Sequence, residues 1–109
     1  SSWICFQGDA VGALFSESLG CLVDVDVSNG FVSVALLSAS NFMDLSCLLS
    51  VSIYDLSGDL LLSYAQPFLL AHGHLSLFPF SLSDSVSCVV VDISFMGHSL
   101  ADVVWRRGD

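Results

Sequence analysis

The chain contains no lysine and no threonine, and arginine is its only strongly basic residue. Its 109 residues carry 11 acidic side chains against two basic ones, which gives a formal net charge of −9. Proteins that bind nucleic acid carry a basic patch that neutralises phosphates. We therefore expect no nucleic-acid contact. Disorder is excluded as well, because 54% of the residues are hydrophobic and a disordered chain is poor in such residues.

The scarce residue types share a property of the genetic code. Lysine and threonine are absent and methionine occurs only twice, and all three use codons that begin with adenine. Phenylalanine, leucine, valine and serine are abundant, and their codons are rich in uracil. We interpret the pattern as a nucleotide bias of the kind that some viral genomes show, which is a hypothesis about origin.

Charge is also missing from residues 60–83, a stretch long enough to cross a bilayer. It contains Pro67 and Pro79, together with His72 and His74. A membrane helix tolerates such residues badly, because lipid offers no partner for the backbone groups that they free. We therefore predict no membrane span.

The four cysteines form no C-x-x-C pair, which argues against a zinc ribbon. They are Cys5, Cys21, Cys47 and Cys88, and each lies in an apolar run. Four cysteines allow three complete disulfide pairings, among which the sequence does not choose. Their apolar surroundings favour the interpretation that the cysteines are free, buried thiols.

Apolar and polar residues alternate cleanly over residues 23–27, and Asn29-Gly30 separates them from a second apolar run. Asn-Gly is the strongest signal for a two-residue hairpin loop, because its central residues need positive φ. Asp24 and Asp26 then fall on one face and the apolar residues on the other. The expected partners are Ser28 with Phe31, Val27 with Val32, Val25 with Val34, and Val23 with Leu36.

A second hairpin is predicted around a two-residue loop, Ser57-Gly58. The alternative is a three-residue loop with Gly58 in the left-handed conformation, which matches the apolar pattern less well. The expected partners are Ile53 with Leu62, Ser52 with Ser63, and Val51 with Tyr64.

Several further segments have strand character. Residues 86–95 are apolar on both faces, which predicts a central strand. Residues 74–78 precede Pro79, which predicts an edge strand or a strand end. Residues 3–6 and 12–15 are further strand candidates, and residues 99–105 form either a last strand or a helical turn. Short strands separated by turns predict an all-β fold, a β-sandwich of jelly-roll-like or immunoglobulin-like type built from antiparallel hairpins, as one domain over residues 1–109.

The segment Gly97-His98-Ser99-Leu100-Ala101 resembles the nucleophile elbow of α/β-hydrolases. In that family the acid and the histidine follow the serine along the chain, whereas no histidine follows Ser99 here. We therefore favour a loop after a strand over a catalytic serine.

His72 and His74 have the spacing that places two imidazoles on one side of a strand. A metal site would need a third ligand, such as Asp84 or His98, which the spacing does not single out. Asp24 and Asp26 form a pair of carboxylates two residues apart, which general acid–base chemistry uses. Exposed acids on a half-buried strand are far commoner. We expect no catalytic residues, no metal and no cofactor.

The last three residues, Arg107-Gly108-Asp109, form the RGD tripeptide that recurs in integrin ligands. Three-residue matches arise easily by chance, and the tripeptide stands here only as a candidate interaction site.

Two partial family resemblances follow from these strands. Cys47 and Cys88, in Leu-Ser-Cys-Leu-Leu-Ser and Asp-Ser-Val-Ser-Cys-Val, resemble the cysteines of the B and F strands of immunoglobulin domains. The stretch 51–108 resembles the closing strands of picorna-like plant virus coat proteins, in its Ile-Tyr-Asp-Leu segment, its long strand 87–95 and its final Trp-Arg-Arg-Gly. The second resemblance implies assembly into a shell and no catalysis.

The functional prediction rests on the large share of apolar residues. A domain of this size cannot bury so many large side chains internally, because its surface is large relative to its volume. We therefore expect a non-enzymatic structural protein that buries apolar surface by assembly with other subunits, most specifically a viral coat component of a virion. The alternatives are an immunoglobulin-like extracellular recognition module, and an enzyme or metal-binding domain built on Ser99 or on His72 and His74.

Overall fold

The protein is all-β over the residues described by the computed structural model, which are 5–7, 21–28, 30–38, 45–70, 75–82 and 85–108. These residues form eight strands and no helix. The strands are β1 (Cys5–Gln7), β2 (Cys21–Ser28), β3 (Phe31–Ser38), β4 (Leu45–Asp55), β5 (Leu60–Leu70), β6 (Leu75–Ser81), β7 (Val86–Phe95) and β8 (His98–Arg106).

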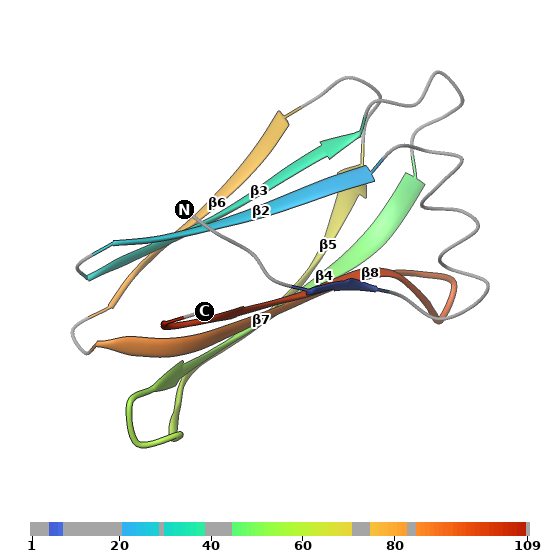
Figure 1. The fold of residues 1–109 in the computed structure, drawn as a ribbon. Coiled ribbons are helices and arrows are strands. Elements are labelled where there is room, and N and C mark those ends of the chain that lie inside the picture. The colour runs from blue at the N-terminus through green and yellow to red at the C-terminus, as the bar shows by residue number, and fades with distance from the viewer. Residues whose placement is uncertain are drawn as a thin grey trace.

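The strands lie in two sheets that face each other (Figure 1). The large sheet has the order β1-β8-β7-β4-β5 and the small sheet the order β2-β3-β6. All neighbouring strands are antiparallel. The predicted β-sandwich is therefore confirmed, and β7 is the central strand of its sheet, as its two apolar faces predict.

The core fills the space between the sheets, because alternate residues of each strand point inward. Val25, Val34, Leu49 and Ile53 are completely buried. Two aromatic pairs join β5 to β6 across the sandwich: Tyr64 with Phe80 at 5.3 Å between ring centroids, and Phe68 with Phe78 at 5.8 Å. Both pairs are edge-to-face, the geometry that the quadrupoles of the rings favour.

The β2–β3 hairpin has the predicted register at every pair, from Ser28 opposite Phe31 to Val23 opposite Leu36. Asp24 and Asp26 are exposed on the outer face, opposite Ala35 and Ser33. Gly30 has a φ of 71°, as the second residue of such a loop requires. Asn29 lies outside the described residues.

The β4–β5 hairpin confirms the predicted pairs, including Ile53 opposite Leu62, but the two-residue loop is wrong. The register shifts by one residue after Ile53, so that Tyr54 lies opposite Leu60. The N–H of Asp55 donates to the Asp59 carbonyl at 2.9 Å, which closes a loop of three residues, 56–58. Gly58 has a φ of 86°, and its N–H donates to the Asp55 carbonyl at 3.1 Å. The Asp55 carboxylate explains the longer loop, because its Oδ1 accepts the N–H groups of Ser57 in the loop and of Asp59 directly after it.

The remaining strands decide the alternatives that the sequence left open. β6 lies at an edge of the small sheet, but it runs through Pro79 to Ser81, so the strand does not end at the proline. Residues 99–105 belong to β8, and the helical turn is wrong. The candidate at residues 3–6 overlaps β1 at Cys5 and Phe6, whereas residues 3 and 4 and the candidate at 12–15 lie outside the described residues. Within the described part of the chain, no helix is long and apolar enough to cross a membrane.

Candidate functional site

The hairpin between β7 and β8 carries the segment that resembles a nucleophile elbow. Met96 and Gly97 form its loop with φ values of 51° and 80°, and Phe95 lies opposite His98. Ser99 is therefore part of a strand in an antiparallel hairpin. In the hydrolases the serine lies at a sharp turn between a strand and a helix, an arrangement that the described residues around Ser99 do not have.

The hydroxyl of Ser99 donates a hydrogen bond of 2.6 Å to Oδ1 of Asp92 on β7. Asp102 of β8 lies directly opposite Asp92, so two half-buried carboxylates are neighbours on the outer face of the large sheet. The sequence did not reveal this cluster, because its members become neighbours only through the strand register. Over the described residues, no group of three or more histidine, cysteine, aspartate or glutamate side chains is placed to hold a metal ion.

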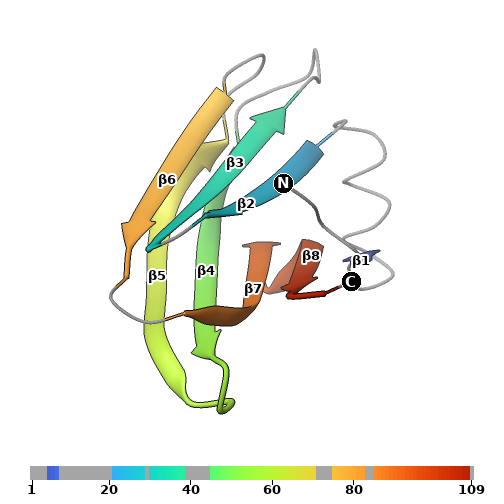
Figure 2. The ribbon, with the colours of Figure 1, turned by 60° about the vertical axis from the view of Figure 1, so that its left-hand side comes forward.

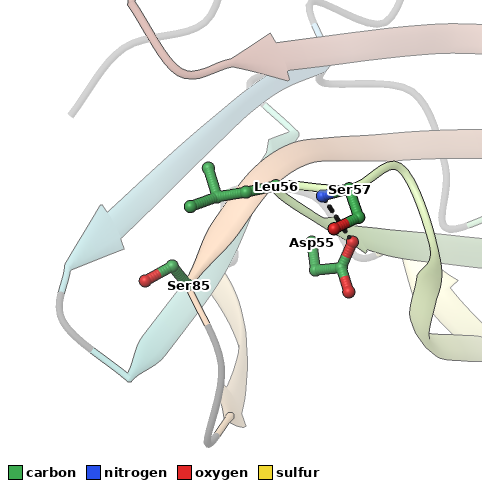
Figure 3. Close-up of a pocket in the computed structure, with 4 residues that line it drawn as sticks. All are labelled: Asp55, Leu56, Ser57 and Ser85. Carbon is green, nitrogen blue, oxygen red and sulfur yellow. Dashed lines mark hydrogen bonds between the residues drawn. The ribbon is translucent and has the colours of Figure 1, made fainter.

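A pocket of about 250 Å³ lies beside the β4–β5 loop and is lined by Asp55, Leu56, Ser57 and Ser85 (Figure 3). Oδ1 of Asp55 accepts the backbone N–H groups of Ser57 at 2.8 Å and Asp59 at 2.9 Å. The hydroxyl of Ser87 also donates to the Asp55 carbonyl. The polar groups of Asp55 thus hold the loop in shape, which is a structural role.

Arg107 of the predicted RGD site is bound to its own domain. Its Nε donates to the Val86 carbonyl at 2.8 Å, and its backbone N–H donates to the Ser87 carbonyl at 2.9 Å. The guanidinium lies 5.8 Å from the centre of the Trp105 ring, within the range of a cation–π contact. Gly108 is exposed, and Asp109 lies outside the described residues. A receptor that reads the arginine would have to compete with these contacts.

The other candidate residues are not brought together. His72 and His74 lie outside the described residues, as does Asp84. His98 is exposed next to the β7–β8 loop. Asp24 and Asp26 are exposed on β2, which is the solvated position that the alternation predicts.

Cys47 and Cys88 lie in adjacent strands of the large sheet and form no disulfide. Cys47 is buried on the inner face of β4, and Cys88 lies on the outer face of β7 opposite Tyr54. A bridge of the immunoglobulin type connects two sheets, so this pair is not positioned to form one. Cys5 and Cys21 have no described side chains.

One surface stands out for its lack of charge. On the outer side of β4 and β5, six exposed residues contain no ionisable side chain. We call this set the β4–β5 outer face: Ser46, Leu48, Ser63, Ala65, Pro67 and Leu69. Leu48 is 41% exposed and Leu69 is 56% exposed. The signal in the sequence was the uncharged stretch 60–83, which raised the membrane question and lies partly in this surface.

Comparisons with protein-family models, with curated proteins and with solved structures find no match for this chain.

Proposed function

We propose that this chain is a non-enzymatic structural protein that works by assembly with other protein subunits. The observation that supports the proposal is the β4–β5 outer face, where Leu48 and Leu69 remain exposed on the side of the sheet that faces away from the core. Apolar area that stays in water favours association, because burying it against a partner releases free energy in proportion to the area.

Further apolar side chains are exposed elsewhere on the molecule. Among the residues that the structure describes, the large ones are Phe31, Leu56, Leu60, Leu77 and Met96. Phe31 and Leu77 belong to neighbouring strands on the outer side of the small sheet. Apolar surface on both sides of the sandwich is consistent with a subunit that contacts more than one neighbour.

The more specific proposal is a viral coat component. It rests on the resemblance of residues 51–108 to coat protein strands and on the codon bias, and the β-sandwich is compatible with it. Electron microscopy of the purified protein at high concentration tests this part: closed particles or regular sheets support it, and small discrete oligomers oppose it.

Assembly itself is tested by sedimentation velocity and light scattering of the purified chain in the absence of detergent. We expect oligomers at tens of micromolar that dissociate on dilution. A monodisperse monomer over this whole range contradicts the proposal.

A further inference from the structure

β5 is the outermost strand of the large sheet, and one of its edges has no strand partner among the described residues (Figure 2). Ala65, Gln66 and Pro67 are exposed in succession. In a strand whose edge is covered, exposed and buried residues would alternate. The exposure of three consecutive residues therefore indicates that the edge of β5 is open to solvent. An open edge presents unpaired N–H and C=O groups to any strand that can reach it.

Charge restricts which partner fits this edge. β5 has no charged residue along its whole length, and neither has β6. The described acids lie elsewhere: on β2, at the β4–β5 loop and on β7 and β8. Natural edge strands commonly carry charges that oppose pairing, and β5 lacks them. In a chain of net charge −9, an approach through this edge brings no charged side chain of β5 or β6 against the partner.

Pro67 fixes which backbone groups face outward. It keeps its place opposite Leu48 in the ladder with β4, which a proline does when its nitrogen points to the free edge. Hydrogen-bonding direction alternates along a strand, and no register shift separates Pro67 from Ser63. The N–H and C=O groups of Ser63 and Ala65 therefore point outward as well.

We propose that β5 pairs antiparallel with β5 of a second copy about a two-fold axis at Tyr64, so that the two large sheets become one continuous sheet. Ser63 of each copy then lies opposite Ala65 of the other, and each such pair exchanges both of its N–H···O bonds. The pairing uses residues 62–66, which lie between the irregularity near Leu61 and Pro67. The inference rests on the proposed function and names one of its interfaces.

A second copy fits this edge better than an unrelated extended segment. A two-fold interface presents the same strand on both sides, and an uncharged strand opposite itself brings no like charges together. The side chains that meet on the outer face, from Ser63 and Ala65, are small, so the strands can approach to normal sheet spacing.

The test is the substitution Ala65→Pro, which removes an outward N–H and leaves the ladder to β4 intact. We expect it to weaken dimerisation roughly tenfold or more, because symmetry removes a hydrogen bond at both copies of the pair. Ser63→Glu is a second variant, which places a carboxylate beside the pairing strand. Ser28→Glu is the matched control, because it puts the same change at an exposed serine of β2.

Sedimentation equilibrium gives the association constant of each variant, and circular dichroism shows that each one is folded. Amide hydrogen exchange adds a direct measurement: the N–H groups of Ser63 and Ala65 should gain protection as the protein concentration rises. If wild type assembles but both β5 variants assemble as Ser28→Glu does, without concentration-dependent protection, the β5 interface is overturned and the proposed function stands. If the wild-type protein is monomeric, both the β5 interface and the proposed function are contradicted.

Discussion

Ser99 Oγ lies 2.6 Å from Oδ1 of Asp92, which connects the two strands of the β7–β8 hairpin on the outer side of the large sheet. The contact lies beside a register shift, where Ile93 is opposite Ala101 and Ser94 is opposite Ser99. An extra residue in β8 aims the Ser99 hydroxyl at Asp92, as bulges commonly redirect side chains.

Ser99→Ala should therefore destabilise the fold by about 1–2 kcal/mol, because a half-buried carboxylate loses a charge-assisted hydrogen bond. Urea denaturation measures the loss, and Ser63→Ala, at an exposed serine without a charged partner in its register, is the control. Equal stability of the two variants would show that the Asp92 contact contributes nothing.

Leu48 and Leu49 are sequence neighbours with opposite environments: Leu48 is 41% exposed and Leu49 is completely buried. Leu49→Ala should cost about 2–5 kcal/mol, since it removes buried methyl groups and leaves a cavity. Leu48→Ala should change the stability of the monomer by less than about 0.5 kcal/mol. Thermal and urea unfolding of the two variants measure both values, and a reversed order would mean that the inner and outer faces of β4 are assigned incorrectly.

Met96 has a φ of 51° in the β7–β8 loop, and its side chain is 82% exposed. A methionine in this conformation is strained and gains nothing from packing, whereas asparagine adopts it readily. Met96→Asn should stabilise the fold by about 0.5–1 kcal/mol. The melting temperature reports the gain, and Met96→Val, which is branched at Cβ and resists positive φ, should lower it.

Assembly should strengthen with added salt. Each copy carries a net charge of −9, and salt shortens the Debye length from about 10 Å at 0.1 M to about 3 Å at 1 M. Repulsion between copies falls while contacts through uncharged strands are unaffected. Light scattering across a sodium chloride series measures the effect. Oligomers that dissociate as salt rises would instead be held together by ion pairs.

The sequence predicts the hairpin registers well where one pattern governs both strands. Val25 and Val34 alternate with polar residues on either side of Asn29-Gly30, so apolar burial and turn chemistry specify the same pairing. The β4–β5 loop differs because the Asp55 side chain competes for backbone N–H groups there. The alternation of apolar and polar residues predicts which strand residues pair, but it contains no information about a side-chain hydrogen bond within a loop.

The candidate sites were harder to predict than the strands. Asp92 and Ser99 are close only because β7 and β8 pair with a one-residue shift, and no spacing rule in one strand contains that information. A loop was expected at 97–101, but the loop is formed by Met96 and Gly97, and Ser99 already belongs to β8. The sequence did not indicate a turn at Met96, because methionine is unusual at positive φ. The order of strands depends on contacts between distant segments, such as β3 with β6, which local patterns do not encode.

The route of the chain between the sheets has a kinetic consequence. β2 and β3 form a local hairpin, but the third strand of their sheet, β6, arrives only after β4 and β5 have been laid down in the other sheet. The chain therefore loses loop-closure entropy before the small sheet is complete. Sheets that pair segments far apart in the sequence typically fold over milliseconds to seconds. Until β6 docks, the inner valines of β3 lack the aromatic rings of Phe78 and Phe80, and a chain at that stage of folding exposes to solvent the apolar residues that later form its core.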